Sequence, residues 1–209
     1  MNPKAVILDV DGTLIDSTSA ITKRHELTAE KMGLRKVGVD EFMRESGKGW
    51  REIIHELWPE VDVEKFVDVY FTTPKLPYPA VPGAIDAVRK LKAQGFVLGI
   101  VTGKSTYSAE DQLKEEGFDL EWFDFVHGED ALAACKPNAG AFDNALTILG
   151  LKGITKEETV YVGDSPNDEA AAIGAGLRFI AVLTGHNTKE DFGGVEIIES
   201  VAELPDALS

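Results

Sequence analysis

Five short apolar runs recur along the chain, separated by turn residues and by helical patterns. They are AVILDV (5–10), FVLGIVT (96–102), FDFVHG (123–128), TVYVGD (159–164) and RFIAVL (178–183). Each run is continuous rather than alternating, which is typical of strands that are covered on both faces. The stretch 195–208 predicts an edge strand followed by a short helix.

Amphipathic helical patterns lie between these runs, at 82–95, 108–117, 138–150 and 165–176. Each pattern ends at a glycine (Gly95, Gly117, Gly150 and Gly176), where we expect the left-handed conformation that closes many helices. Strands that alternate with helices predict an α/β fold with a doubly wound parallel sheet.

Residues 16–79 interrupt this alternation, because they contain helical patterns (19–33, 49–58 and 62–71) and no convincing strand. The first two strands are therefore much further apart than one crossover helix requires. We predict a Rossmann-like core formed by residues 1–15 and 80–209, with an inserted α-helical cap formed by residues 16–79. Four prolines in 72–83 indicate a stiff return linker.

The charge and cysteine content of the chain limit the kinds of molecule that it can bind and the compartment in which it works. The formal net charge of −15 disfavours nucleic acid and anionic membranes as partners, whereas a small phosphorylated metabolite requires a local cation. A single cysteine, Cys135, fits a reducing compartment. No run of 18 apolar residues and no signal-like N-terminus occur, so we expect a cytoplasmic protein. The sequence leaves monomer and homodimer open.

Acidic, hydroxyl and basic residues follow the predicted strands. Asp9 and Asp11 follow the first strand, Thr102 and Gly103 end the second, Lys136 follows the third, and Asp164 follows the fourth. The carboxyl ends of parallel strands meet at one edge, where such sheets bind ligands. Carboxylates that converge there need a cation, and hard oxygen ligands suit Mg²⁺.

These residue types predict phosphate chemistry. A bound Mg²⁺, Lys136, the Thr102 hydroxyl and backbone N–H groups after Asp9 would hold a tetrahedral phosphate, and Gly12 and Gly103 are further candidates for substrate binding. Asp9, with an ordinary pKa of about 3.9, would be ionised and act as nucleophile. Asp11 would protonate the leaving oxygen and later deprotonate the hydrolytic water.

Several of these residues could also have purely structural roles. Asp9 and Asp11 would also suit a turn, and Lys136 could be solvated. Glu129 and Asp130 are interpreted as a solvated turn, and the histidines as structural. The segment GIVTGKS (99–105) is one residue too short for a P-loop, so we reject that nucleotide site.

Four segments resemble, in order and spacing, the motifs of the haloacid dehalogenase superfamily: DVDGTLIDS (9–17), VTGKS (101–105), CKP (135–137) and VGDSPND (162–168). The resemblance implies that Asp9 is phosphorylated, that Asp11 is the acid/base, and that Thr102 and Lys136 bind phosphate. It also implies that Asp164, the Asp9 carboxylate and the Asp11 main-chain carbonyl bind Mg²⁺. Asp168 would lie beside these ligands.

Within the superfamily, the chain looks most like the phosphoglycolate phosphatases. The segment SGKGWREII (46–54) is similar to a cap loop of that group, from which Lys48 could reach the substrate. The favoured function is a Mg²⁺-dependent phosphatase acting on 2-phosphoglycolate. The alternatives are a phosphomutase of the β-phosphoglucomutase type, a phosphatase acting on a sugar phosphate, nucleotide or pyrophosphate, and a phosphate-accepting signalling receiver.

Overall fold

A six-stranded parallel sheet forms the centre of the structure, a computed structural model that describes residues 2–45 and 48–209. The strand order is β3-β2-β1-β4-β5-β6, and each neighbouring pair runs parallel. The strands are β1 (Ala5–Leu8), β2 (Val97–Val101), β3 (Phe125–His127), β4 (Thr159–Gly163), β5 (Arg178–Val182) and β6 (Glu196–Ile198). The predicted doubly wound α/β fold is therefore confirmed.

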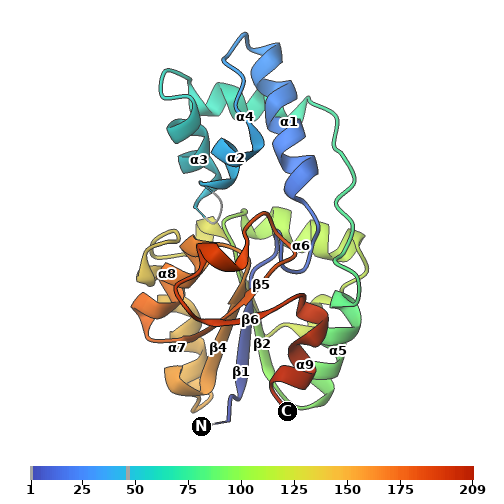
Figure 1. Cartoon of the computed structure of the whole chain (residues 1–209), viewed down its shortest axis with the longest axis vertical. Coiled ribbons are helices and arrows are strands. Elements are labelled where there is room, and N and C mark those ends of the chain that lie inside the picture. Colours follow the sequence, from blue (N-terminus) through green and yellow to red (C-terminus); the bar gives the residue numbers. More distant parts are fainter. Residues whose placement is uncertain (1, 46–47) are drawn as a thin grey trace.

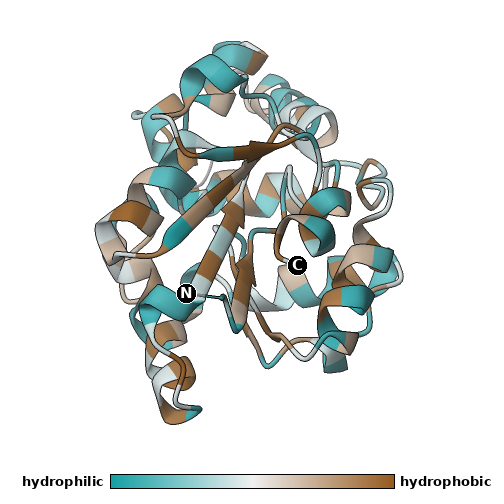
Figure 2. Ribbon diagram, turned by 60° about the horizontal axis from the view of Figure 1, so that its bottom comes forward, coloured by the Kyte–Doolittle hydropathy of each residue, from teal (hydrophilic) through white to brown (hydrophobic). Residues whose placement is uncertain are grey.

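Helices cover both faces of the sheet (Figure 1). One face packs against α5 (Ala84–Ala93), α6 (Thr106–Glu115) and α9 (Leu204–Ala207), and the other against α7 (Asp143–Leu151) and α8 (Pro166–Ala175). Successive side chains of a strand point to opposite faces. In β1, Val6 and Leu8 accordingly join the first hydrophobic cluster, whereas Ala5 and Ile7 join the second. Figure 2 shows these mainly hydrophobic strands between helices whose outer surfaces are more polar.

One predicted helix end is wrong. The helix expected over 138–150 starts as a 3-10 helix at Ala139–Phe142 and continues as α7 to Leu151. Gly95, Gly117 and Gly176 take the expected positive φ, but the corresponding glycine after α7 is Gly153, with φ 73°, rather than Gly150. The later turn lets Ile154 N donate to Leu149 O at 3.0 Å, which returns Ile154 to the same hydrophobic cluster as Leu149.

Four helices form a separate group above the carboxyl ends of the strands (Figure 1). They are α1 (Thr18–Lys31), α2 (Val39–Met43), α3 (Trp50–Leu57) and α4 (Val63–Phe71), of which the short α2 was not predicted. They share their own hydrophobic cluster, which includes Ile54 and Phe66. The two connections to the sheet run side by side, since Asp16 N donates to Pro79 O at 2.8 Å. The division into a core and a cap at these points stays a prediction.

Among the described residues, every helix is too short or too polar to span a membrane.

Candidate active site

Three of the predicted site residues follow adjacent strands. Asp9 directly follows β1, Thr102 follows β2 and Asp164 follows β4, and β1 pairs with both β2 and β4. Between β1 and β4 the order of the chain in the sheet reverses, and open α/β sheets bind ligands outside the carboxyl ends of strands at such a point. The topology thus places Asp9 and Asp164 at the edge where the sequence predicts a site.

Lys136 forms the base of this site. Its Nζ lies 3.0 Å from Asp9 Oδ2 and 2.5 Å from Asp168 Oδ1, and it donates to the Tyr161 hydroxyl at 2.8 Å. The side chains of Lys136 and Asp168 are completely buried. The other oxygen of Asp168, Oδ2, accepts from both the N–H and the hydroxyl of Ser165. The lysine is therefore a buried counter-ion that holds the Asp9 carboxylate in place, and Asp168 in turn holds the lysine.

Asp9, Asp164 and Asp168 form a buried acidic cluster, in which one carboxylate oxygen from each lies within 4.8 Å of the others. Two glycines allow the Asp164 carboxylate to occupy its position. A Cβ on Gly12, whose φ is +68°, would lie 2.2 Å from Asp164 Oδ2, and a Cβ on Gly185 would lie 1.8 Å from the same atom. Neither position can carry a side chain unless Asp164 moves.

Burial raises the pKa of Asp9 from 3.8 to about 6. The positive charge of Lys136 lowers this pKa, and the negative charge of Asp168 raises it. The expectation of an ordinary pKa for this carboxyl group was therefore wrong, because the sequence does not show how deeply the group is buried. Burial and the neighbouring carboxylates also raise the pKa of Asp164 well above its usual range. Lys136 alone therefore supplies too little positive charge to bring the pKa values of both Asp9 and Asp164 down to their usual range.

Asp11 lies outside this acidic cluster and has different partners. Its Oδ2 is 2.8 Å from Lys104 Nζ, and its Oδ1 accepts from the Ser17 hydroxyl, next to the start of α1. Lys104 belongs to the predicted VTGKS motif but was not among the predicted site residues, so its contact with Asp11 was not expected. The signal that could have found it was its place two residues after Thr102, at the same edge of the sheet.

Thr102 and Gly103 line the space above Asp9. The Thr102 side chain is buried, and its Oγ1 accepts from Lys104 N at 3.4 Å. Its own O–H can therefore donate to a group in this space. Lys136 differs, because its Nζ contacts the Asp9 carboxylate while the residue itself does not line the space.

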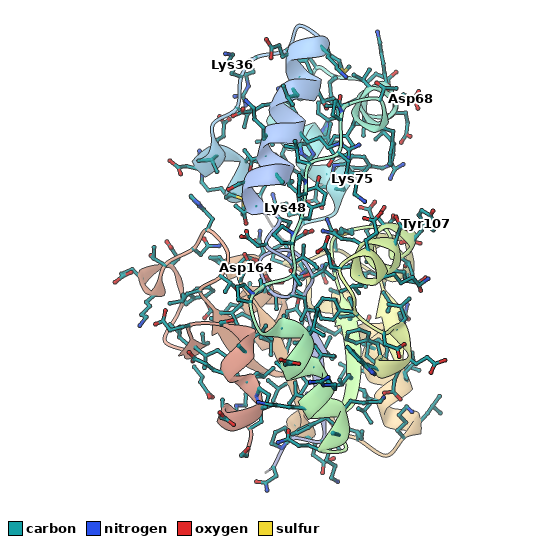
Figure 3. All side chains as sticks on the ribbon, turned by 90° about the vertical axis from the view of Figure 1, so that its right-hand side faces the viewer. Lys36, Lys48, Asp68, Lys75, Tyr107 and Asp164 are labelled. Carbon is teal, nitrogen blue, oxygen red and sulfur yellow. The ribbon has the colours of Figure 1, made fainter. Side chains whose placement is uncertain are left out.

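A cavity of about 320 Å³ separates the sheet from the helical group. Figure 3 shows Lys48 and Lys75 on the helical side, above Asp164. Lys48 Nζ pairs with Glu45 Oε2 at 2.5 Å, while its preceding residues, Ser46 and Gly47, lie outside the described residues. Predicted site residues that line this cavity are Asp9, Asp11, Gly12, Lys48, Thr102, Gly103 and Asp164.

Glu129 joins the core to the helical group, although the sequence predicted a solvated turn at this position. Its Oε2 accepts from Trp50 N, at the start of α3, at 2.8 Å, and its Oε1 lies 3.3 Å from Arg51 Nη1. A Cβ on Gly49 would approach Cys135 Sγ to 2.8 Å and Glu129 Oε2 to 3.0 Å. The interpretation as a solvated turn was wrong because this contact depends on two segments that are far apart in the sequence.

The haloacid dehalogenase-like hydrolase family model matches residues 6–182 of this chain. A phosphoglycolate phosphatase of Nitrosococcus oceani is 28% identical in an alignment of 222 positions, gaps included, which covers 99% of this chain and 97% of that protein. The pyrophosphatase PpaX of Halalkalibacterium halodurans is 31% identical in an alignment of 214 positions, which covers 99% of this chain and 97% of that protein. The crystal structure of a subfamily IA hydrolase from Geobacter sulfurreducens matches with a TM-score of 0.69 and 27% identity, covering 99% of this chain and 97% of that one.

Proposed function

This chain belongs to the haloacid dehalogenase-like hydrolases, and from that premise we propose that it is a Mg²⁺-dependent phosphatase that forms an aspartyl-phosphate on Asp9. One observation carries the proposal: the Asp9 carboxylate lies at the cavity floor, held by the buried Lys136 at 3.0 Å and grouped with Asp164. A nucleophile needs this combination of fixed orientation, an ionised form and access to substrate.

The donor set of the acidic cluster fits Mg²⁺, which prefers carboxylate oxygens and retains water. Both oxygens of Asp168 already accept hydrogen bonds from Lys136, Tyr161 and Ser165. We therefore assign the metal to Asp9, Asp164 and the Asp11 main-chain carbonyl, with Asp168 as the group that positions Lys136. When bound, Mg²⁺ supplies positive charge that offsets the charge of the phosphate.

The remaining groups carry out the chemistry. The Asp9 carboxylate attacks phosphorus while Asp11 gives a proton to the leaving oxygen, and in the second step Asp11 takes a proton from the water that attacks the aspartyl-phosphate. The Thr102 hydroxyl and the backbone at Gly12 and Gly103 bind phosphate oxygens. Lys104, 2.8 Å from Asp11, orients the acid/base and adds positive charge to the cavity.

The substrate is a small phosphate compound, for which 2-phosphoglycolate is the first choice. The phosphoglycolate phosphatase of Nitrosococcus oceani and the pyrophosphatase PpaX both support a leaving group of a few atoms. The test is phosphate release from 2-phosphoglycolate, pyrophosphate, sugar phosphates and nucleotides, measured with Mg²⁺ and again after chelation with EDTA. We expect turnover that is lost with EDTA and restored by Mg²⁺.

Asp9→Asn tests the nucleophile, because an amide of nearly equal volume attacks phosphorus poorly. We expect turnover to fall roughly 10³-fold or more. The matched control is Asp86→Asn, the same change at an exposed residue of α5, which should keep wild-type turnover. A folded Asp9→Asn variant that turns over substrate at the wild-type rate would overturn the mechanism.

A further inference from the structure

Several buried donor groups without a hydrogen-bond partner line the cavity. Among residues 2–45 and 48–209, five buried side-chain polar atoms have no hydrogen-bond partner. Three of them belong to residues that line this cavity: Arg24 Nε, the Tyr78 hydroxyl and Gln112 Nε2. All three can donate a hydrogen bond. Because buried polar groups normally find partners, this concentration indicates a ligand with acceptor atoms.

Arg24 provides the strongest evidence. Arg24 is only 8% exposed. Its guanidinium lies 4.0 Å from the centre of the Tyr70 ring, and its Nη2 donates a hydrogen bond to Tyr70 O at 3.0 Å. Within the described part of the chain it forms no ion pair with a carboxylate. The buried Lys136, in contrast, lies between two aspartates. An unpaired buried charge is costly, so a protein with an excess of acidic residues gains from pairing it.

The neighbouring side chains do not supply an acceptor or a negative charge for Arg24. His25 accepts from Trp50 Nε1 at 2.9 Å, and its other ring nitrogen lies 2.9 Å from Ile21 O, so a neutral ring uses both nitrogens. Lys104 is paired with Asp11. Asp111 also lines the cavity but is exposed, so it does not neutralise the buried wall.

The position of Arg24 along α1 matches a short leaving group. Arg24 lies seven positions after Ser17, whose hydroxyl binds Asp11. A helix rises about 1.5 Å per residue, which gives about 10 Å between their backbones. Side chains in a helix lean toward its N-terminus, which brings the guanidinium closer to Asp11. A leaving group of two or three carbons, held at each end by a hydrogen bond of about 2.8 Å, spans a comparable distance.

We propose that Arg24, supported by Tyr78 and Gln112, binds an anionic group at the far end of the leaving group, and so selects substrates that carry a carboxylate or a second phosphate there. The inference rests on the proposed phosphatase function and adds to it the residues that recognise the leaving group. Arg24 acts in binding and takes no part in proton transfer.

The test compares substrates of nearly equal size. 2-Phosphoglycolate carries a carboxylate where 2-hydroxyethyl phosphate carries a neutral hydroxyl, and pyrophosphate carries a phosphate. For Arg24→Gln we expect kcat/KM for 2-phosphoglycolate to fall roughly 10- to 100-fold, the usual effect of losing a charged hydrogen bond. For 2-hydroxyethyl phosphate we expect a change within about threefold. An equal loss on pyrophosphate identifies a general anion site, and no loss on pyrophosphate identifies a carboxylate site.

Two further variants separate recognition from structure. Arg44→Gln removes the same charge from an exposed position of the helical group and should leave both substrates unchanged. Arg24→Lys keeps the charge and should recover part of the selectivity. The Tm of ligand-free Arg24→Gln should equal or exceed that of the wild type, because an unpaired buried charge has been removed.

The outcomes are distinct. If Arg24→Gln lowers kcat/KM equally for the charged and neutral esters, or lowers neither, the inference is wrong while the phosphatase function stands. A clear fall in its ligand-free Tm with unchanged selectivity would assign Arg24 a structural role and also overturn the inference. If the wild type releases phosphate from none of the compounds, the proposed function fails and the inference fails with it.

Discussion

His25 gives a prediction whose size follows from the structure. The ring is buried in the helical group, 4.8 Å from the Tyr70 ring and 4.7 Å from the Phe42 ring. Burial is the main cause that lowers the pKa of His25 from its ordinary 6.5 to about 4, and the nearby charges of Lys104 and Arg24 contribute to the same shift. The folded protein therefore keeps His25 neutral at pH values where the unfolded chain binds a proton.

The sign and the magnitude follow from this difference. Between pH 6.5 and pH 4 the unfolded state binds more protons than the folded state, so the free energy of unfolding falls as the pH falls. The contribution of His25 to the free energy of unfolding is fully present above pH 6.5 and is lost as the pH falls through 4. Each pKa unit corresponds to about 1.4 kcal/mol, so the whole effect of His25 is about 3 kcal/mol.

The assay is urea unfolding of the wild type and His25→Gln from pH 7.5 to pH 4.5. Glutamine cannot titrate, and its carbonyl can still accept from Trp50 Nε1. The stability advantage of the wild type over His25→Gln should shrink by about 2–3 kcal/mol across this range. His55→Gln, at an exposed position of α3, is the control and should stay within about 0.5 kcal/mol of the wild type. A pH-independent difference between the wild type and His25→Gln would refute the reasoning.

Two substitutions at the site have equally direct expectations. Gly12→Ala puts a Cβ 2.2 Å from Asp164 Oδ2 and places alanine in a strained backbone conformation. We expect Mg²⁺ to bind at least tenfold more weakly, as measured by titration calorimetry. An unchanged affinity would contradict the role of Asp164 in metal binding. Lys136→Met leaves Asp9 and Asp168 buried without their shared counter-ion, so at pH 7 and without Mg²⁺ the free energy of unfolding should fall by about 3–5 kcal/mol. Urea unfolding measures it, and a loss below about 1 kcal/mol would show that the lysine is not the counter-ion.

The sheet could be predicted because its strands carry a local signal. A continuous apolar run that ends in acidic or hydroxyl residues identifies both a buried strand and its carboxyl end, and parallel topology brings such ends to one edge. Asp9, Thr102 and Asp164 were found in this way. Lys136 was found in the same way, but its ion pairs with Asp9 and Asp168 could not be predicted, because the sequence does not show which side chains surround a buried lysine.

The residues that the sequence missed are defined by contacts between distant segments. Tyr161 looks like an ordinary strand residue, yet its hydroxyl lies within hydrogen-bond distance of both Lys136 and Asp168. Arg24 looks like a surface residue of an amphipathic helix until Tyr70, from another helix, covers it. Helical periodicity indicates which residues face inward, but it does not show what they face.

The contact of Glu129 with α3 links substrate access to a side chain outside the cavity. Burial raises the pKa of this carboxyl group, while the Trp50 N–H and Arg51 oppose the rise. Any widening of the gap between the helical group and the sheet would have to release Glu129 into water. Because the chain continues from Glu129 to Lys136, the contact with the helical group and the base of the site share one stretch of backbone. Substitutions at Glu129 would therefore change how firmly the helical group is held to the core, without altering a residue of the proposed phosphate site.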